Sequence, residues 1–346
     1  MGKGKILVTG GTGYIGSHTV VELCNAGYEP IIIDNLSNSN INVLEGIKTI
    51  TGHPVTYENI DCKDYNSLER FLEKHSEIVA IAHFAASKSV GESVNNPLLY
   101  YRNNILSLIN LLQLMAKFNI KNIVFSSSCT VYGQADVLPV TEQTPIKPAS
   151  SPYGSTKQMC ETILQDAAFA NKDLNAILLR YFNPIGAHPS AEIGELPNGI
   201  PNNLLPYITQ TAAGIRKELS VFGDDYNTPD GSCIRDYINV VDLAKAHVVA
   251  LNRMVEGQNK KNIEIFNLGT GEGVSVLEII RTFEKATGVK VPYKIAPRRA
   301  GDIEKVWADT SYANKELGWK AETSLEDTLL SAWNWQKKLA EKNLGN

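Results

Sequence analysis

The sequence predicts an α/β protein with a doubly wound parallel sheet of the Rossmann type and a smaller C-terminal substrate-binding lobe. Short apolar runs alternate with longer amphipathic segments through residues 1–182, a pattern typical of a parallel sheet with helices on both faces. The first apolar run leads directly into a glycine-rich turn. Beyond residue 182 the alternation breaks into stretches rich in Gly, Pro, Asn and Asp, which indicate the loops of a second lobe.

Six apolar runs are the expected strands of the sheet: Ile6–Thr9, Glu29–Ile33, Val55–Asn59, Ile78–Phe84, Asn122–Ser126 and Ala176–Tyr181. The longest expected helix runs from Pro97 to about Phe118. Later segments predict helices near 240–254, 276–286 and 324–339 and a strand near 263–267. We therefore expect a cofactor domain over 1–182 and a substrate lobe over 183–346, with residues of about 233–270 packing back on the first domain. The carboxyl ends of the strands should line one crevice, where ligands bind.

Composition excludes several classes of protein. With 346 residues the chain is long enough for two lobes. Its net charge of −4 favours neither a nucleic acid nor a membrane surface as a partner. No apolar run reaches the length of a membrane span, and the start lacks a signal peptide. The five cysteines are widely spaced without a C-x-x-C pair, which favours reduced thiols and a cytoplasmic location. The scattered histidines predict no metal site.

The glycine-rich turn predicts a phosphate site. Gly10, Gly13 and Gly16 stand between the first strand and a helix, where small residues permit a tight turn and a close approach of a pyrophosphate to the backbone. The helix start adds free N–H groups and the positive end of its dipole. A turn with no ligand is the alternative. Asp34 ends the second apolar run, and a carboxylate there accepts hydrogen bonds from ribose hydroxyls. Because no Arg stands beside it, we expect NAD rather than NADP.

Further polar or small residues follow the next strands. Asp61 could reach an adenine amino group, or it could cap a helix beginning at Lys63, and both readings stay open. Phe84 precedes two alanines that would let a cofactor cross the strand end. Lys88 is either a ribose or phosphate contact or a solvated lysine.

Hydroxyl groups and a Tyr–Lys pair predict proton and hydride chemistry. Ser126–Thr130 ends the fifth strand, and Tyr153 and Lys157 stand four apart at the start of the next helix, hence on one helix face. Removing a hydride from a carbinol requires a base for the hydroxyl proton. A phenolate is suitable, but it needs cationic neighbours because free tyrosine has a pKa near 10. We therefore expect Lys157 and the positively charged nicotinamide ring both to favour the Tyr153 phenolate, and Ser128 to hold or relay the proton. An exposed pair at a helix start is the alternative.

In the second half, amide and guanidinium groups are candidates for substrate contacts. Asn side chains donate and accept, which suits uracil or sugar groups. Arg235 and the pair Arg298–Arg299 are candidate diphosphate clamps. The alternative for Arg235 is a salt bridge with Asp236 or another carboxylate. Trp333 and Trp335 are expected in the core or at a subunit interface.

These motifs together resemble the extended short-chain dehydrogenase/reductase family and, within it, the UDP-glucose 4-epimerases. The resemblance covers nearly the whole chain and includes residues 9–16, 34–35, 83–86, 100–102, 125–128, 132–133, 153–154, 179–184, 201–204, 235–237, 267–271 and 298–302.

The resemblance implies a role for each matching position. Tyr153 would be the base, with Lys157 and Ser128 completing the catalytic group. The residues implied to contact a tightly bound NAD are Gly10, Gly13, Tyr14, Ile15, Gly16, Asp34, Asn35, Leu36, Ser37, Asn38, Asp61, Cys62, Phe84, Lys88, Asn104, Lys157 and Tyr181. Those implied to hold a UDP-hexose are Ser128, Cys129, Thr130, Tyr153, Asn183, Asn202, Asn203, Leu204, Phe222, Arg235, Arg299, Asp302 and Val306. A homodimer is implied as well.

The implied reaction, in galactose metabolism, is the reversible C4 epimerisation of UDP-glucose and UDP-galactose. Tyr153 would take the 4-OH proton while C4 gives a hydride to NAD; the 4-keto sugar turns, and the hydride returns to its other face from enzyme-bound NADH. At the position of Val306 the family varies between Tyr and smaller residues, and a small side chain there favours UDP-GlcNAc and UDP-GalNAc as further substrates.

Rival functions differ in what they require. A nucleotide-sugar dehydratase needs an acid and a base beside the catalytic hydroxyl, where this chain has Cys129 and Thr130. A uronate epimerase or decarboxylase would need contacts for a sugar carboxylate, which the sequence excludes less firmly. A non-catalytic NAD-binding sensor would have no need of Ser128, Tyr153 and Lys157.

Overall fold

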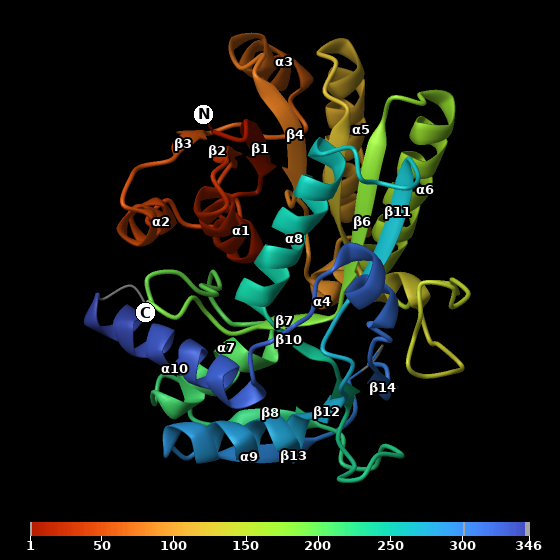
Figure 1. The fold of residues 1–346 in the computed structure, drawn as a ribbon. Coiled ribbons are helices and arrows are strands. Elements are labelled where there is room, and N and C mark those ends of the chain that lie inside the picture. The colour runs from red at the N-terminus through yellow and green to blue at the C-terminus, as the bar shows by residue number, and fades with distance from the viewer. Residues whose placement is uncertain (1, 300–301, 343–346) are drawn as a thin grey trace.

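The computed structural model describes residues 2–299 and 302–342. Within them, seven parallel strands form the central sheet, in the order β11-β6-β5-β4-β1-β2-β3 (Figure 1). The α/β doubly wound class predicted from the sequence is confirmed. The strands are β1 (Lys5–Thr9), β2 (Glu29–Ile33), β3 (Thr56–Glu58), β4 (Ile78–His83), β5 (Asn122–Ser128), β6 (Asn175–Tyr181) and β11 (Ile263–Leu268).

The strand order reverses direction between β1 and β4, and this creates the ligand crevice. From β1 the chain first builds outward through β2 and β3, then crosses over to β4 on the other side. The helices that follow β1 and β4 therefore lie on opposite faces of the sheet, and open α/β sheets bind ligands at the carboxyl edge between two such strands.

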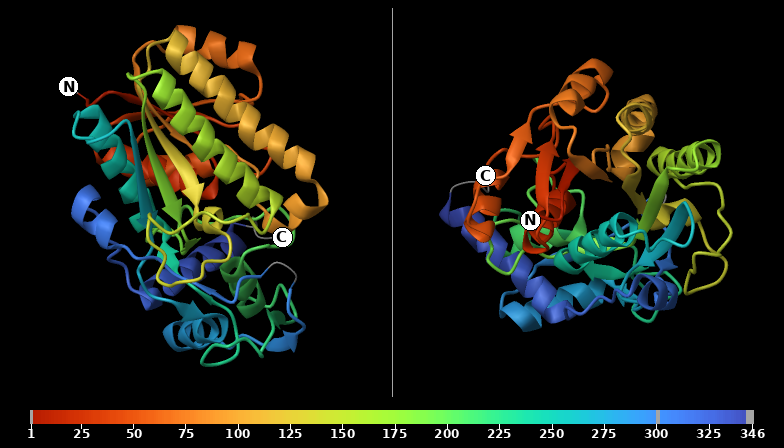
Figure 2. Two further views of the ribbon diagram at one scale, coloured as in Figure 1. Left: turned by 90° about the vertical axis from the view of Figure 1, so that its right-hand side faces the viewer. Right: turned by 45° about the horizontal axis from the view of Figure 1, so that its top comes forward.

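Helices cover both faces of the sheet because its strands are apolar on both sides. Ile6, Leu7 and Val8 of β1 are all fully buried, as expected for a parallel strand between two helical layers. One layer contains α1 (Tyr14–Asn25), α2 (Val43–Thr51) and α8 (Val240–Val255), and the other contains α3 (Tyr65–Lys74), α5 (Pro97–Lys117) and α6 (Pro152–Ala170). Figure 2 shows the two layers on either side of the strands.

A second group of elements lies below the carboxyl edge of the sheet (Figure 1). It has a core of its own around Ile208, Phe283 and Leu329. Its helices are α7 (Leu204–Ala212), α9 (Val276–Thr287) and α10 (Leu325–Glu341). Its strand pairs are β8 (Leu219–Phe222) with β13 (Tyr293–Ala296), β9 (Ile234–Arg235) with β12 (Val274–Ser275) and β14 (Lys305–Val306), and β7 (Asn183–Ile185) with β10 (Tyr237–Asn239).

The chain returns from this second group to the first. Helix α8 packs against α1, and β11 pairs with β6 at the edge of the main sheet. Strand β5 is two residues longer than the sequence predicted and β3 is two residues shorter. The extra residues of β5 are Ser127 and Ser128, because the register Ser128↔Tyr181 continues the ladder to the crevice.

The two tryptophans of α10 are accounted for within the chain. The Trp333 ring meets Phe283 edge-on with centroids 5.9 Å apart. The Trp335 Nε1 donates to the Glu195 carbonyl at 3.0 Å. Both contacts join α10 to other parts of the described chain, so these residues are part of its core packing.

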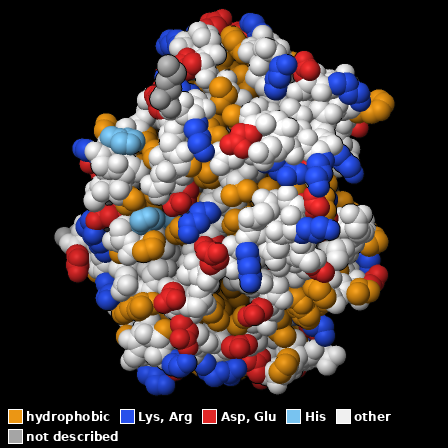
Figure 3. Space-filling model, viewed as in Figure 1, with side chains coloured by type: hydrophobic (Ala, Val, Ile, Leu, Met, Phe, Trp, Pro, Cys, Tyr) orange, Lys and Arg blue, Asp and Glu red, His pale blue; other side chains and the backbone are white. Residues whose placement is uncertain are grey.

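The surface shows no large field of one charge on the face in Figure 3, where acidic and basic side chains are interspersed. Among the described residues, no helix has the length and apolar character that crossing a membrane would require.

Candidate active site

The glycine turn after β1 is so close to its neighbours that side chains would not fit. A Cβ on Gly16 would lie 2.2 Å from the Gly10 carbonyl oxygen, and a Cβ on Gly10 would lie 2.8 Å from the Ala85 nitrogen. Gly10 also has a φ of +71°, which favours glycine. The turn therefore brings the start of α1 against the loop after β4 and leaves the backbone exposed to a ligand.

The start of α1 fits a pyrophosphate. Its N-cap is Gly13, which offers no side-chain cap, and the first turn of the helix carries no acidic residue. The first N–H groups of a helix need external acceptors and attract anions. Tyr14 and Ile15 begin this helix, as the sequence predicted.

The Asp34 carboxylate, which was predicted to bind the ribose of NAD, directly follows β2 and is held by hydrogen bonds from its neighbours. One oxygen accepts from the Thr12 amide at 3.3 Å. The other accepts from the Leu36 amide at 2.9 Å and from the Ser39 hydroxyl at 3.1 Å. Leu36 takes a left-handed φ of 57° to close this loop. The loop presents Asn35, Ser37 and Asn38 as exposed side chains.

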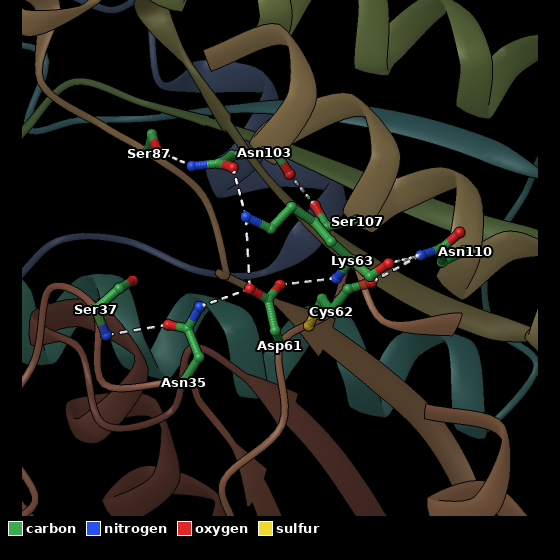
Figure 4. Close-up of polar contacts among 9 residues, drawn as sticks. All are labelled: Asn35, Ser37, Asp61, Cys62, Lys63, Ser87, Asn103, Ser107 and Asn110. Carbon is green, nitrogen blue, oxygen red and sulfur yellow. Dashed lines mark hydrogen bonds and ion pairs between the residues drawn. The ribbon is translucent and has the colours of Figure 1, made fainter. Parts of the chain in front are cut away.

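A chain of polar side chains runs beside this loop from the end of β2 to α5 (Figure 4). Asn35 donates to Asp61 at 3.0 Å, and the other oxygen of Asp61 accepts from the Lys63 amide at 2.9 Å. Lys63 Nζ donates to Asn103 Oδ1 at 2.8 Å, and Asn103 Nδ2 donates to Ser87 Oγ at 2.9 Å. The loops after three strands are thereby tied together at the crevice.

Two features of this network correct or extend the sequence analysis. Asp61 does not cap the following helix, because α3 begins at Tyr65 and its cap is Asp64, which accepts from Ser67. Asn110 was missed; its amide donates to the carbonyls of Cys62 and Lys63 at 3.1 and 3.0 Å. The sequence does contain a signal for Asn110, because residues 103, 107 and 110 are polar and their spacing places them on one face of α5.

The remaining predicted cofactor residues lie at or near the carboxyl ends of β4 and β6. Phe84 lies 4.8 Å from the His247 ring and Tyr181 lies 5.7 Å from it, measured between centroids. Lys88 is half-exposed and lies 3.6 Å from a Glu195 oxygen. The Asn104 amide is occupied inside the protein, where it bonds the backbone of Ser87 and the Thr156 hydroxyl.

The hydroxyl cluster at the end of β5 is largely buried. Ser128 is 7% exposed and its oxygen accepts from the Thr130 amide at 3.2 Å and from the Thr130 hydroxyl at 3.0 Å. Burial raises the pKa of the Cys129 thiol to about 12, against the smaller effect of the Arg235 charge. Cys129 is therefore a neutral thiol near pH 7 and not a reactive thiolate.

Tyr153 and Lys157 are not an exposed pair at a helix start. Lys157 is 3% exposed and Tyr153 is half-buried. Lys157 Nζ lies 5.9 Å from the centroid of the Tyr153 ring, and it donates to the Ser126 carbonyl. The Tyr100 ring meets the Tyr153 ring edge-on at 6.5 Å between centroids.

The protein alone does not favour the Tyr153 phenolate; the positive nicotinamide ring, the other cation that the sequence analysis invoked, is a part of the bound cofactor. Burial raises the pKa of Tyr153 to about 12, and hydrogen bonding to Ser128 offsets only part of that effect. Burial likewise lowers the pKa of Lys157 to about 8. The sequence analysis considered the charges of Lys157 and the nicotinamide ring but not the loss of water around Tyr153 and Lys157, which disfavours the charged form of each.

The sequence analysis missed a buried ion pair that anchors α6, the helix that carries Tyr153 and Lys157. The Arg180 and Glu161 side chains are 3% and 2% exposed. Glu161 also accepts from Ser127, while Arg180 donates to the Tyr132 hydroxyl at 3.0 Å. Through these contacts the pair joins Ser127 of β5, Arg180 of β6 and Glu161 of α6. Glu161 lies one turn after Lys157 on α6. Buried charges persist only when paired in this way.

On the substrate side, Arg235 is not paired with its neighbour. The buried Asp236 carboxylate accepts from the Thr270, Gly271 and Ala308 amides at 2.8, 3.1 and 3.1 Å. Among the described residues Arg235 has no carboxylate partner; it donates to the Ile234 carbonyl at 2.8 Å. The salt-bridge alternative for Arg235 is therefore wrong as far as these residues show, and its guanidinium charge is not neutralised there.

The second arginine pair divides. Arg299 donates to Asp302 at 2.7 Å, and its guanidinium carbon lies 5.6 Å from the centre of the Phe222 ring. Arg298 instead pairs with Asp225 at 2.7 Å. The structure thus brings Phe222, Arg299 and Asp302 together, as a nucleotide clamp requires, and leaves Arg298 with another partner. Residues 300 and 301 of this motif lie outside the described residues.

The other predicted substrate residues come from β7, the start of α7 and β14. The backbone N–H of Asn183 donates to the Asp236 carbonyl at 2.9 Å. Asn202 and Asn203 are exposed and lead into α7 at Leu204. Val306 is 5% exposed and lies opposite Arg235 in the pairing of β14 with β9.

Comparison with known proteins identifies the family. A family model described as GDP-mannose 4,6 dehydratase matches residues 7–331. UDP-glucose 4-epimerase of Bacillus subtilis (strain 168) is 51% identical over 331 residues, which are 96% of each chain. That of Homo sapiens is 49% identical over 340 residues, covering 96% of this chain and 97% of the other.

A solved structure agrees with these relatives. The crystal structure of UDP-glucose 4-epimerase from Bifidobacterium longum in complex with NAD+ and UDP has a TM-score of 0.94 and 48% identity, and the match covers 99% of this chain and 100% of that one. The resemblance predicted from the motifs is therefore confirmed over nearly the whole length. The chain belongs to the UDP-glucose 4-epimerase family.

Proposed function

We propose that the chain interconverts UDP-glucose and UDP-galactose with NAD as a resident cofactor. The observation that carries the proposal is the Tyr153–Lys157 pair, which lies beside Ser128 at the carboxyl edge of the sheet. The family relationship supports it, because the relatives named above are UDP-glucose 4-epimerases and one was solved with NAD+ and UDP.

The residues present fit the cofactor. The tight glycine turn and the uncapped start of α1 accommodate a pyrophosphate, and Asp34 offers a carboxylate at the end of β2. The proposed contacts are those predicted from the sequence. When bound, NAD supplies an acceptor that takes a hydride from C4 of the sugar and returns it.

Tyr153 performs the proton transfer at the 4-hydroxyl oxygen. Moving a pKa of about 12 to neutral pH takes about 7 kcal/mol of stabilisation of the phenolate, at roughly 1.4 kcal/mol for each pKa unit. The Lys157 ammonium is already present one turn away at that pKa, so the further positive charge would come from the oxidised cofactor. Ser128, whose oxygen already accepts hydrogen bonds from Thr130, holds the proton on its way between sugar and Tyr153.

Inversion at C4 requires that the nucleotide be held firmly while the sugar turns. The unneutralised guanidinium of Arg235 and the Arg299–Phe222 pair provide charge and an aromatic surface for the diphosphate and uracil. Asn183, Asn202, Asn203 and Leu204 would complete these contacts. We therefore place the binding energy in the UDP portion, where it helps both sugars equally.

A dehydratase is the closest rival, since the matching family model carries that description. Elimination of water requires a positioned acid and base. Beside Ser128 this chain has a partly buried, neutral thiol and a hydroxyl that donates to Ser128 itself. Neither group can serve, and this favours epimerisation.

Four finer points belong to the proposal. Val306 leaves a small side chain at the site wall, so we propose turnover of the N-acetylated UDP-hexoses as well. Exposed apolar side chains on α5 and α6, among them Leu98 and Phe169, offer a surface for a homodimer. Five unpaired cysteines among the described residues favour a reducing location such as the cytoplasm. We place the boundary between cofactor and substrate regions near residue 182.

The test is an assay of the purified protein with UDP-galactose and no added NAD. We expect UDP-glucose to form, since the hydride taken from C4 is returned and the cofactor is not consumed. If UDP-glucose forms only after NAD is added, the proposed reaction stands, but the proposal that NAD is a resident cofactor does not. A product lighter by one water molecule would support the dehydratase instead, and no product from any UDP-hexose would contradict the proposal.

A further inference from the structure

We infer that Tyr100 is a positioning residue with two separable roles: its ring supports the ring of Tyr153, and its hydroxyl fixes the turn that carries Lys88. The inference rests on the proposed function, because it assigns a supporting group to that same site. Tyr100 lies in the first turn of α5 and is fully buried.

The ring of Tyr100 meets the ring of Tyr153 edge-on. The two centroids are 6.5 Å apart and the ring planes are inclined by 84°, which is a preferred arrangement for two aromatic side chains. Tyr153 stands at the start of α6, which packs against α5. A base must point its hydroxyl at the reacting oxygen, and small displacements greatly reduce the rate. Tyr100 therefore limits how far the Tyr153 ring can tilt.

The hydroxyl of Tyr100 is engaged as both a donor and an acceptor. It donates to Glu92 Oε2 at 2.7 Å and accepts from the backbone N–H of Ser89 at 2.9 Å. Ser89 is the N-cap of the short helix α4 (Val90–Asn95), and Glu92 is in the first turn of that helix. One buried hydroxyl thereby holds the start of α4 onto α5.

Lys88 stands between two residues whose backbone is bonded to α5. On one side, the Ser87 N–H donates to Asn104 Oδ1 at 2.8 Å, and the Ser87 carbonyl accepts from Asn104 Nδ2 at 3.0 Å. On the other side is Ser89, which is held by Tyr100. Tyr100 and Asn104 are four residues apart and so lie on one face of α5. Without the Tyr100 hydroxyl, only the anchor before Lys88 would remain of these two.

The anchored backbone directs Lys88 towards the predicted phosphate site. Its Nζ lies 5.9 Å from the centre of the Tyr14 ring, and Tyr14 begins α1. The lysine stem is flexible and its side chain is half-exposed, so the backbone determines how much freedom the ammonium has. Helix α5 supports the same turn through Asn103, which donates to Ser87 Oγ at 2.9 Å (Figure 4). The Tyr100 hydroxyl should therefore affect the retention of NAD more than the chemical step.

Tyr100 keeps its proton and does not compete with Tyr153 as a base. Burial raises the pKa of Tyr100 above its usual range, and the hydrogen bond to Glu92 raises that pKa further. Its hydroxyl proton is already donated to Glu92 inside the protein. Tyr100 thus acts on the reaction only through the neighbours that it holds.

The test of the hydroxyl is Tyr100→Phe in NAD-loaded protein. We expect bound NAD to dissociate about tenfold faster, within the range for losing a hydrogen bond to a charged group. The kcat for UDP-galactose at saturating NAD should change less than about threefold, because the ring and its edge contact are kept. Dissociation is measured by exchange against isotopically labelled NAD, followed by mass spectrometry.

The test of the ring is Tyr100→Leu, which removes the aromatic edge together with the hydroxyl. NAD should dissociate as fast as from Tyr100→Phe, but kcat at saturating NAD should fall at least tenfold because Tyr153 is no longer held. The KM for UDP-galactose should change less than about threefold, since the UDP portion is proposed to bind elsewhere. If this variant does not fold, Tyr100→Met, whose flexible side chain fills irregular space, takes its place in the same measurements.

Tyr28 provides the matched control. It is 5% exposed, its hydroxyl donates to Asn252 at 2.8 Å, and it precedes β2 at the amino end of the sheet. Tyr28→Leu should lower the melting temperature, and neither Tyr28→Leu nor Tyr28→Phe should change kcat or the dissociation of NAD.

Glu92→Ala tests the hydroxyl contact from the side of its partner. This variant should also speed the dissociation of NAD. Adding Tyr100→Phe to it should then have little further effect, because residues in contact are coupled.

Several results would overturn the inference: wild-type NAD dissociation in Tyr100→Phe, a kcat within threefold of wild type in the folded variant without the ring, an equal loss of kcat in Tyr100→Phe, or equal losses in the Tyr28 variants. NAD exchange needs no turnover, so it separates this inference from the proposed function. A wild-type protein that retains NAD without turning over any UDP-hexose would contradict the function and still test the hydroxyl, whereas a protein that binds no NAD would contradict both.

Discussion

Lys157 Nζ lies inside the protein, 5.9 Å from the centre of the Tyr153 ring, and donates to the Ser126 carbonyl at the end of β5. The ammonium is thus fixed by the sheet and not by the tyrosine hydroxyl. Its effect on Tyr153 is electrostatic, and burial works against the charge of both groups. The catalytic pair is therefore incomplete until a further positive charge enters the site.

Replacing Tyr153, the proposed base, should strongly reduce turnover without unfolding the protein. In Tyr153→Phe we expect kcat for UDP-galactose to fall by about 10² to 10⁴, the usual contribution of general acid–base catalysis. The ring and its edge contact with Tyr100 are kept, so UDP affinity and the melting temperature should stay near wild type. A kcat within tenfold of wild type would exclude Tyr153 as the base.

The pKa of Tyr153 should fall when NAD binds. In cofactor-free protein burial holds it at about 12, and a positive charge nearby favours the phenolate. The ultraviolet absorbance of tyrosinate, taken as the difference between wild type and Tyr153→Phe, measures it directly. We expect the midpoint to drop by several pH units with NAD and by much less with NADH, whose ring is neutral. Equal midpoints with and without NAD would contradict this account.

Acid should destabilise the protein partly through His247. Its ring is fully buried beside Phe84 and Tyr181, and burial lowers its pKa to about 4. Below pH 6.5 the unfolded chain binds a proton that the folded chain refuses, so lowering the pH favours unfolding. From pH 7 to pH 5 this costs roughly 2 kcal/mol.

The variant His247→Gln should remove that part of the pH dependence. Denaturant titrations at pH 7 and pH 5 would give the change in the free energy of unfolding, which should shrink by roughly 2 kcal/mol in the variant. His53→Gln is the control, since it makes the same substitution at an exposed histidine. An unchanged difference in His247→Gln would show that His247 does not titrate as described.

Bulk at position 306 should discriminate between plain and N-acetylated sugars. Val306 packs with Phe182 and Val131 at the wall beside Cys129. We expect Val306→Tyr to reduce turnover of UDP-GalNAc more than tenfold while UDP-galactose turnover changes only a few-fold. Val306→Ala, which adds no bulk, should retain both activities. Equal losses for both sugars in Val306→Tyr would indicate general disruption and contradict the assignment.

The fold could be predicted because its signals are local. Apolar runs buried on both faces mark the strands of a parallel sheet, and the glycine turn marks the crossing from β1 to α1. The length of β5 was misjudged because Ser127 and Ser128 look like loop residues. They belong to the strand because their pairing with Arg180 and Tyr181 of β6 continues the ladder. The Ser127 hydroxyl also donates to Glu161 of α6, and no local pattern encodes either contact.

The candidate residues Ser128, Tyr153 and Lys157 could be singled out from the sequence, since they lie at a strand end or in the first turns of a helix. The groups that support them could not. The Arg180–Glu161 pair joins a strand to a helix in the buried core, and Asn267 reaches Tyr132 at 2.6 Å from the far edge strand β11. Such pairs depend on which segments become neighbours, whereas the pKa of Tyr153 depends on burial, and neither is visible before the chain is folded.

The most direct test of the central claim follows the hydrogen at C4. UDP-galactose carrying deuterium at C4 is incubated with the protein in ordinary water, and the UDP-glucose formed is examined by mass spectrometry and NMR. If the hydrogen leaves C4 as a hydride and returns within the site, the product keeps the deuterium at C4 and none enters the solvent. A product with ordinary hydrogen at C4 would show that it left as a proton, and this would contradict the account.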